Sequence, residues 1–348
     1  MKRFLVKVLL FFVVSAGVLA AWQWDWVTYG WMQLSGGARV ILDARPVSEV
    51  LTDRAIPDSV KAKLRLMEEI RRFAIDSIGL SNTPNYQTYY DQHGKPICYV
   101  LTVAEKYALQ GVDFSFPVIG SFAYKGFFDP ERARREEKDW QAKGYDTEVS
   151  PVSAYSMLGY FRDPILSGML QLPEGRMASM LMHEMTHATL FVRNEHEFNE
   201  NLANFVGDYG AERFLAHRFG RSSPQYRNYG QGKIFRERYI RHFNRGKDLL
   251  DSLYKGFPPA LPETEKESRK QQLIGEILRT TDTLYRNLDQ VRRRQWKDED
   301  RPNNAFFIGF STYNSRRNEF ETEFRNRFHG DFRRYFAYLR SKYSSLRD

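Results

Sequence analysis

Hydrophobic and polar positions alternate in two different ways along the first half of the chain. Apolar residues recur every three or four positions over residues 60–80, which predicts an amphipathic helix. The runs NYQTYYD and PICYVLTV flank His93 and Gly94, and this arrangement predicts a β-hairpin. The aromatic, glycine-punctuated residues 116–129 predict one or two strands, and residues 145–161 predict a strand and a loop. The first half is therefore expected to mix helices and strands.

Helix start and stop signals extend this picture. Residues 130–144 predict a helix, because Asp129 can cap its start and Gly144 can end it. After Asp163 the pattern is helical almost throughout, over residues 173–193, 196–220, 235–256, 265–296 and 318–343. Two of these segments are long and charged and are joined by the proline-rich linker FPPALPETEKE. They are expected to form a helical pair, at about residues 230–297, that projects from the core.

The whole pattern predicts an α+β fold, with a small mixed sheet followed by a helix pair and a mainly helical C-terminal half. The 348 residues are 42% hydrophobic and 27% charged, so the chain can bury a sizeable core. The net charge is +9, but no basic run is interleaved with aromatic residues as in a nucleic-acid module, so no nucleic-acid partner is expected. Cys98 is the only cysteine, which excludes an intrachain disulfide and a CxxC metal site.

The N-terminus has the charge layout of an export signal. Three basic residues among the first seven precede an apolar run over residues 8–21, and Ala20 and Ala21 permit cleavage. The run is shorter than the roughly 20 residues of a spanning helix, yet the three tryptophans that follow it suit a membrane interface. Residues 1–24 are therefore expected to be a signal peptide or a membrane anchor. The alternative is a buried N-terminal helix.

Export would place the protein in the periplasm or on the bacterial inner membrane, where it could associate with the membrane through its N-terminus. Residues 36–348 are expected to form a single domain that includes the charged helical pair. The size of this domain makes stability without disulfides acceptable in an exported protein.

Candidate chemistry lies in the apolar stretch MLMHEMTHATLF, at residues 180–191. On a helix, His183 and His187 share one face, one turn apart, close enough to bind one zinc ion. Glu184 then lies about 100° round the helix, from where it can reach a water molecule without ligating the metal. The alternative is a buried helix with two core histidines that have hydrogen-bond partners.

A catalytic zinc site needs a third protein ligand. The residues after HEMTH resemble a second helix start, with Asn194 as N-cap and Glu197 reaching back to it. The two helices are then expected to form an antiparallel hairpin, in which residues equidistant from the turn face each other. This brings Glu200 level with His187, whereas Glu197 lies too near the turn and Glu212 too far from it. The alternative is that Glu200 is a solvated surface residue.

The motifs HEMTH and NENLANFVG resemble those of the glutamate zincins, or gluzincins. Thermolysin-like members carry an aspartate four residues after the glutamate ligand, where it supports a histidine; this chain has Asn204 there. A wider resemblance covers most of residues 36–340. The segments GARVILDARPVSEVL, EIRRFAIDSIGL, FPVIGSFAYKGFFD, SAYSMLGYFRDPILSGML, HEMTHATLF, FNENLANFVGDYGAERF and NNAFFIGFSTY resemble, in this order, the bacterial family of predicted aminopeptidases.

These features predict a zinc-dependent peptidase with a zincin-like fold, and the resemblance implies an aminopeptidase that acts on peptides or proteins. One Zn²⁺ would be held by His183, His187 and Glu200. Glu184 would accept a proton from the attacking water and pass it to the leaving amine.

Two tyrosines are candidates for the remaining roles, from their positions in the motifs. Tyr313 would stabilise the oxyanion, and Tyr155 is the second candidate, as a substrate-binding residue. The stretch FPVIGSFAYKGFF could provide an edge strand for an extended peptide. Endopeptidase action stays open, and the alternative class is an exported zinc-binding scaffold or binding protein without catalysis. The presence of Glu184 argues against that class, because a purely structural zinc site does not need it.

Overall fold

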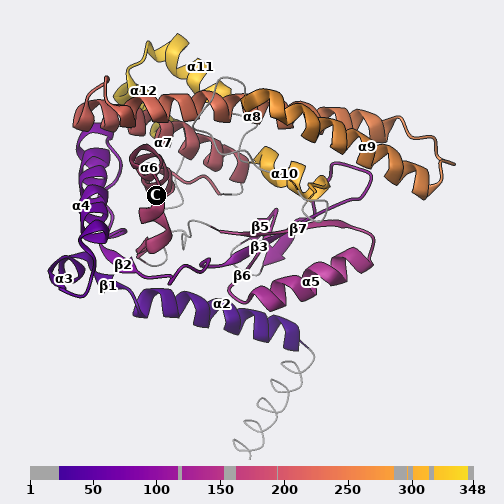
Figure 1. The fold of residues 1–348 in the computed structure, drawn as a ribbon, viewed down its shortest axis with the longest axis horizontal. Helices are drawn as coiled ribbons and strands as arrows, with labels where there is room; N and C mark the ends of the chain where they lie inside the picture. The colour runs from indigo at the N-terminus through magenta and orange to yellow at the C-terminus, as the bar shows by residue number, and fades with distance from the viewer. Residues whose placement is uncertain are drawn as a thin grey trace, which may run out of the picture.

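Strands precede the helix that carries HEMTH, and helices follow it, so the predicted α+β class is confirmed (Figure 1). The computed structural model describes residues 23–116, 120–152, 162–193, 195–285, 296, 301–312 and 317–343. In chain order its elements are α2 (Trp24–Leu42), β1 (Arg45–Pro46), α3 (Val47–Thr52), α4 (Asp58–Phe73), η1 (Ala74–Ile78), β2 (Thr88–Tyr90), β3 (Tyr99–Ala104), β4 (Phe114–Phe116), β5 (Gly120–Phe122), β6 (Lys125–Phe127), α5 (Pro130–Ala142), β7 (Asp146–Pro151), β8 (Ile165–Leu166), η2 (Ser167–Gln171), α6 (Glu174–Thr189), α7 (His196–Phe219), α8 (Pro224–Lys255), α9 (Glu263–Thr281), η3 (Asp282–Tyr285), α10 (Asn304–Thr312), α11 (Arg317–Phe328) and α12 (Phe332–Lys342).

The described strands form three small sheets instead of the single mixed sheet expected from the sequence. Their orders are β1-β2-β8, β6-β3-β7 and β4-β5, and only the β2-β8 pair is parallel. The predicted hairpin around His93 and Gly94 is therefore wrong. Both residues do turn the chain, at φ of 49° and 73°. However, β1 and β8 already occupy both edges of β2, so no edge is left for β3.

Several helix predictions are confirmed, with shifted ends. The helix predicted at residues 60–80 is α4 followed by the π-helical turn η1. The Asp129 carboxylate accepts a hydrogen bond from the Glu131 amide at 2.9 Å, as expected of the residue that caps α5. The helix predicted at residues 318–343 is instead the pair α11 and α12, because the chain turns at Gly330 with φ of 80°.

The antiparallel helices α6 and α7 lie in the main hydrophobic core. Both contribute fully buried side chains, which include Met177, Leu181, Met182, Met185, Leu202 and Val206. Two glycines let α7 approach α6 closely. A Cβ atom on Gly207 would lie 2.5 Å from the carbonyl oxygen of Ser179, and one on Gly210 would overlap the sulfur of Met182. Small residues at these two positions therefore set the distance between the helices.

The predicted helical pair is formed by α8 and α9, with different bounds. α8 begins at Pro224 instead of residue 235, and the Ser223 hydroxyl caps it by accepting from the Tyr226 amide at 3.2 Å. α9 ends at Thr281 instead of residue 296. The pair extends beyond α6 and α7, as expected (Figure 1).

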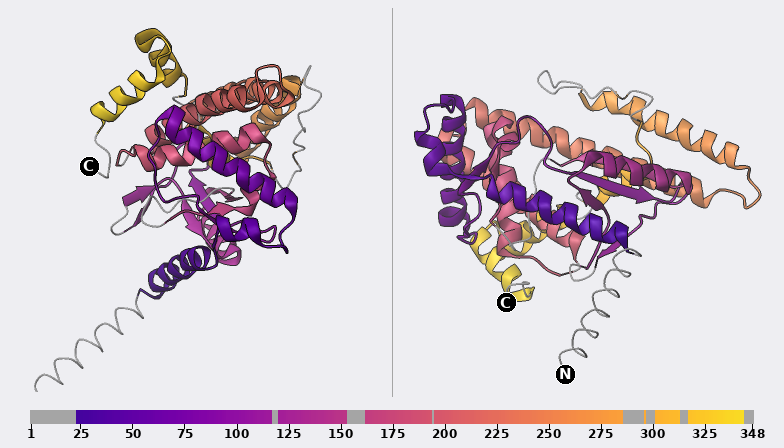
Figure 2. Two further views of the ribbon diagram at one scale, coloured as in Figure 1. Left: turned by 90° about the vertical axis from the view of Figure 1, so that its left-hand side faces the viewer. Right: turned by 90° about the horizontal axis from the view of Figure 1, so that it is seen from below.

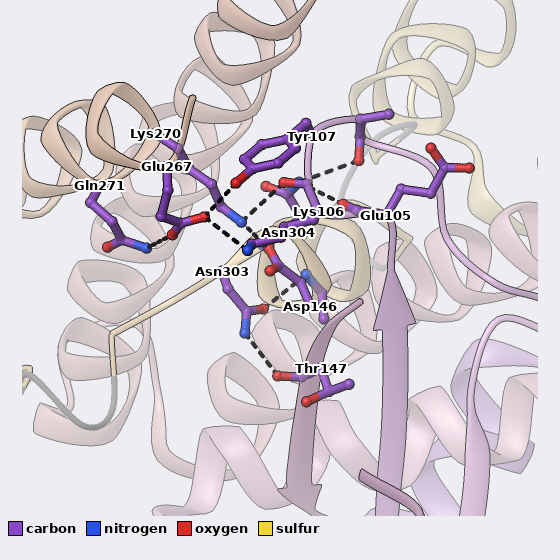
Figure 3. Close-up of polar contacts among 12 residues, drawn as sticks. Glu105, Lys106, Tyr107, Asp146, Thr147, Glu267, Lys270, Gln271, Asn303 and Asn304 are labelled. Atoms are coloured by element: carbon purple, nitrogen blue, oxygen red, sulfur yellow. Dashed lines mark hydrogen bonds and ion pairs between the residues drawn. The ribbon is translucent and has the colours of Figure 1, made fainter. Parts of the chain in front are cut away.

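A buried polar network nevertheless ties this pair to the strands (Figure 3). The ammonium of Lys270 on α9, with a side chain only 1% exposed, donates to Asp146 Oδ2 on β7 at 2.5 Å and to the Lys106 carbonyl at 3.0 Å. The backbone amide of Asn304, at the start of α10, donates to the same Asp146 oxygen at 2.8 Å. One buried carboxylate thus joins β7, α9 and α10.

The first described helix, α2, packs one face against β6, and its other face is exposed on the surface of the molecule (Figure 2). The Tyr29 hydroxyl and the Gln33 amide both donate to the Gly126 carbonyl, at 2.9 and 2.6 Å. The export signal was expected at residues 1–24, of which residues 1–22 lie outside the described residues. Among the helices that the structure describes, none combines the length and the apolar character needed to cross a membrane.

Candidate metal centre

The predicted cluster is brought together between α6 and α7. His183 and His187 lie one turn apart on α6, and their side chains are 17% and 10% exposed. Glu200, in the second turn of α7, lies opposite them and is 8% exposed. In the described part of the chain, these three residues are the group of histidine and carboxylate side chains whose ligand atoms converge as a metal site requires.

Three distances define the cluster. The two Nε2 atoms lie 3.1 Å apart, Glu200 Oε2 lies 3.3 Å from His183 Nε2, and Glu200 Oε1 lies 3.4 Å from His187 Nε2. Ligands at 2.0–2.1 Å from a tetrahedral zinc ion are separated from one another by about 3.3 Å. The three side chains therefore lie close enough together to hold one metal ion. The donor set, two imidazoles and one carboxylate, is also one that zinc takes in catalytic sites.

The alternative glutamates do not join the cluster. Glu195 and Glu197 are exposed near the turn. Glu212 forms an ion pair with Lys233 on α8, at 2.6 Å. The position of Glu200 opposite the two histidines, predicted from the symmetry of the hairpin, is therefore confirmed.

The turn between the helices is fixed by Asn199, a contact that the sequence did not reveal. The Asn199 side chain, 1% exposed, accepts from the Val192 amide at 2.9 Å and donates to the Val192 carbonyl at 2.7 Å. The residue before α7 is Glu195, whose side chain makes no capping hydrogen bond. Asn194 lies outside the described residues, so the predicted capping box of Asn194 and Glu197 stays a prediction. Asn199 closes the hairpin directly before Glu200.

The outer nitrogens of the two histidines differ in their surroundings. Asn204 Oδ1 lies 3.1 Å from His183 Nδ1, where it can accept the ring proton and leave Nε2 free to bind a metal. The resemblance to the gluzincins predicted a side chain at position 204 that supports a histidine ligand, and Asn204 lies in contact with His183. His187 Nδ1 is buried and has no partner in the described part of the chain.

Burial and neighbouring charges shift the pKa values of Glu184 and Glu200 in opposite directions. Burial alone would raise the pKa of Glu200, but the hydrogen bond with His183 and the charge of His187 lower it to about 2. Burial lowers the pKa of His187 to about 4. Burial also raises the pKa of Glu184 to about 7, with Glu200 and Asp163 adding to the effect. The cluster thus offers an ionised carboxylate and a neutral imidazole, which are the ligating forms, beside a carboxyl that can exchange a proton near neutral pH.

Tyr86 and Asp163 lie near Glu184, and the sequence reading missed both. The charge of Glu184 raises the pKa of Tyr86 further, after burial, and the charge of Asp163 acts on both residues. The Tyr86 amide donates to the Asp163 carbonyl at 2.7 Å, because both residues precede strands that lie side by side, β2 and β8. Tyr86 has a φ of 62°, and its hydroxyl is buried without a partner in the described part of the chain. A strained backbone and an unpaired phenol are features that cluster at functional sites.

The two tyrosines named from the sequence are not placed. Tyr155 and Tyr313 both lie outside the described residues. The one or two strands expected at residues 116–129 are present as β5 and β6, and β4 ends at the start of that range. The aromatic rings of Phe122 and Tyr124 pack on His196, the first residue of α7. The β4-β5 sheet therefore lies beside the start of the helix that carries Glu200.

Comparison with known proteins gives one match. A family model described as "Putative aminopeptidase" matches residues 28–345. No curated protein and no solved structure shows significant similarity to the chain.

Proposed function

Because the chain belongs to the family described as "Putative aminopeptidase", we propose that it is a zinc-dependent peptidase of zincin-like design. Its centre would be His183, His187 and Glu200 as the ligands of one Zn²⁺, with Glu184 as the catalytic base. The observation that carries this proposal is the convergence of the three side chains: the two Nε2 atoms lie 3.1 Å apart, and each lies within 3.4 Å of one Glu200 carboxylate oxygen. These spacings are close to those between the ligands of a tetrahedral zinc ion.

The proposed chemistry divides between the ion and the chain. A zinc ion held there would polarise the scissile carbonyl and lower the pKa of water. Glu184 accepts the proton of the attacking water and then delivers it to the leaving amine. Its pKa of about 7 lets it hold and release that proton at neutral pH. Asn204 holds the His183 ring with Nε2 directed at the centre.

The oxyanion that develops during the reaction needs a donor from the protein. Tyr313 and Tyr155 are candidates from their positions in the sequence motifs. Tyr86 is a third candidate, because a buried hydroxyl without a partner gains a hydrogen bond when a substrate oxygen reaches it.

The family description favours cleavage at a free N-terminus, and endopeptidase action is the alternative. Within the described part of the chain, the two-stranded β4-β5 sheet pairs with no further strand, so its edge is open to an extended peptide. Sequencing the products from a mixed peptide pool by mass spectrometry separates the two modes. Single residues released from N-termini support the exopeptidase, whereas internal cuts alone rule it out.

The test of the proposed function is hydrolysis of that peptide pool by the wild type and by Glu184→Gln. The variant keeps the size of the side chain and removes the base, so turnover should fall by about 10²-fold or more. Glu197→Gln, on the exposed start of α7, is the matched control and should retain full activity. Equal hydrolysis by wild type and Glu184→Gln would leave the zinc-binding scaffold as the better account.

We also propose export, with α2 lying against a membrane. Large hydrophobic side chains are exposed at eight positions in the described part of the chain, and six of these are on α2. Five of the six follow one stripe along the helix, namely Trp24, Val27, Trp31, Leu34 and Leu42. The apolar run of residues 8–21 leads directly into this helix. Tryptophan and leucine on the outer face of a helix suit a lipid interface.

Sedimentation with vesicles tests the membrane proposal. The protein without residues 1–22 should bind vesicles that contain anionic lipid, and the double variant Trp31→Ser, Leu34→Ser should not. Ile234→Ser removes an exposed apolar side chain from α8 and is the control. Retention of vesicle binding by the double variant would contradict the assignment of α2 as the lipid-facing helix.

A further inference from the structure

A second concave site lies at the opposite end of α6 from the two histidines. The first turn of α6, the N-terminal half of α8 and Tyr285 enclose a cavity of about 700 Å³, a volume typical of sites for small molecules. Arg176 in its wall precedes His183 by about 10 Å along the helix axis. The side chains of the metal centre do not line this cavity. It is therefore a separate site.

Two arginines face this cavity from different helices. Arg236 on α8 donates to Asp208 Oδ1 at 3.1 Å, while its Nε is buried without a partner in the described part of the chain. Arg176 on α6 forms no ion pair or hydrogen bond through its side chain with the described residues. Arg176 is partly exposed, and its partial burial and the nearby charge of Arg236 lower its pKa. Both guanidinium groups line the same cavity and remain charged at neutral pH.

The acidic groups around the cavity are already engaged. Glu174 pairs with Lys63 at 3.3 Å. Asp208 Oδ1 accepts hydrogen bonds from Ser179, Tyr229 and Arg236, at 3.1, 2.5 and 3.1 Å. Once these pairs are counted, the charge of Arg176 is left over among the described residues. The start of α6 adds to it, because no side chain caps this helix and its first N–H groups carry partial positive charge.

Three aromatic residues that line the cavity lie close together. The ring of Phe235 lies 4.9 Å from that of Tyr285 and 5.8 Å from that of Tyr239. The amide side chains of Gln225 and Asn228 also line the cavity and offer hydrogen bonds. Cationic and aromatic side chains in one cavity favour a ligand with an anionic group on an apolar body.

We propose that this cavity binds a small organic anion. A carboxylate or phosphate group is held by Arg176 and Arg236 at the start of α6, and a ring or aliphatic body packs on Phe235 and Tyr285. The inference stands apart from the proposed peptidase activity, because it uses none of the residues of the metal centre.

Calorimetric titration of the full protein with three probes tests the site. The probes are benzoate, phenyl phosphate and uncharged benzamide, at matched ionic strength. We expect saturable binding of at least one anion, and the anion that binds identifies the head group. Arg176→Met should weaken this binding about tenfold or more, which is the loss of a charged hydrogen bond. Arg227→Met, on the exposed face of α8 outside the cavity, should bind as the wild type does.

Two further measurements assign the binding to this cavity. Anions also bind zinc, so the titration is repeated with Glu200→Ala, in which binding should persist. Hydrogen exchange should slow at residues 173–177 and 224–239 when the anion is added. Arg176→Met should keep the circular dichroism spectrum of the wild type, since the Arg176 side chain makes no hydrogen bond or ion pair with the described residues. The inference is overturned by no saturation up to about 10 mM, by equal binding of benzamide, or by unchanged affinity in Arg176→Met.

Discussion

Glu200 is buried and the neighbouring Glu184 is partly buried, and their surroundings shift their pKa values in opposite directions. Glu200 faces both histidines and is held ionised, with its pKa lowered to about 2. Glu184 is partly buried beside two other carboxylates, and its pKa is raised to about 7. When two carboxyl groups have pKa values shifted in opposite directions, they are suited to different roles in acid–base chemistry. The proposed division, in which Glu200 binds the metal and Glu184 moves the proton, follows from these neighbours.

Tyr86 tests whether a buried, unpaired hydroxyl serves catalysis. Tyr86→Phe should leave the free energy of unfolding unchanged or raise it, because the phenol satisfies no hydrogen bond in the described part of the chain. If the hydroxyl stabilises the oxyanion, kcat should fall by about 10- to 100-fold with a smaller change in KM. Steady-state kinetics and urea unfolding measure the two effects. Tyr90→Phe, at the end of the strand β2 that follows Tyr86, is the control, and equal kcat values in the two variants would exclude Tyr86 from the reaction.

At the scale of elements, the HEMTH spacing and the symmetry of a helical hairpin were sufficient to predict α6, α7 and the position of Glu200. The spacing of the two histidines and the distance of a residue from the turn are local properties, because each depends on only a few neighbouring residues. The devices that fix the hairpin were not predicted. Asn199 and Gly207 act through contacts across the hairpin, with Val192 and Ser179, which only the packed structure reveals.

Gly207→Ala should separate the two helices of the metal centre. The added Cβ would lie 2.5 Å from the Ser179 carbonyl oxygen and 3.4 Å from the His183 Cβ, so the backbone must move. We expect a loss of about 1–3 kcal/mol in the free energy of unfolding and weaker metal binding. Gly230→Ala on α8, where a Cβ meets nothing within 4 Å, should instead gain about 0.5–1 kcal/mol. Urea unfolding measures the free energy of unfolding of both variants. Equal changes in the two variants would show that the close approach of α7 to α6 is unimportant for stability.

At the scale of the whole molecule, the α+β class and the extent of the helical half were predictable, whereas the sheet organisation was not. Strand pairing depends on partners far apart in the chain, such as β2 with β8, and a local pattern holds no information about them. The long helical pair was likewise expected to project from the core. The sequence offered no sign that Lys270, one of many charged residues on α9, is the one whose ammonium is buried against Asp146.

Lys270→Met tests this link between the pair and the strands. Removing one partner leaves the Asp146 carboxylate buried without its cation, which should lower the free energy of unfolding by about 3–5 kcal/mol. The neighbouring Arg269 forms only an exposed pair with Glu265, so Arg269→Met should cost less than about 0.5 kcal/mol. Urea denaturation compares the two variants. A similar, small effect of both would mean that the network in Figure 3 contributes little to stability.

The central claim is that His183, His187 and Glu200 bind one zinc ion and that Glu184 does not. The most direct measurement is the zinc content of the wild type, Glu200→Ala and Glu184→Gln after dialysis against a weak chelator. We predict one zinc ion per chain in the wild type and in Glu184→Gln, and loss of zinc from Glu200→Ala, because two neutral imidazoles alone hold the ion too weakly. Full zinc in Glu200→Ala, or none in the wild type, would contradict the account.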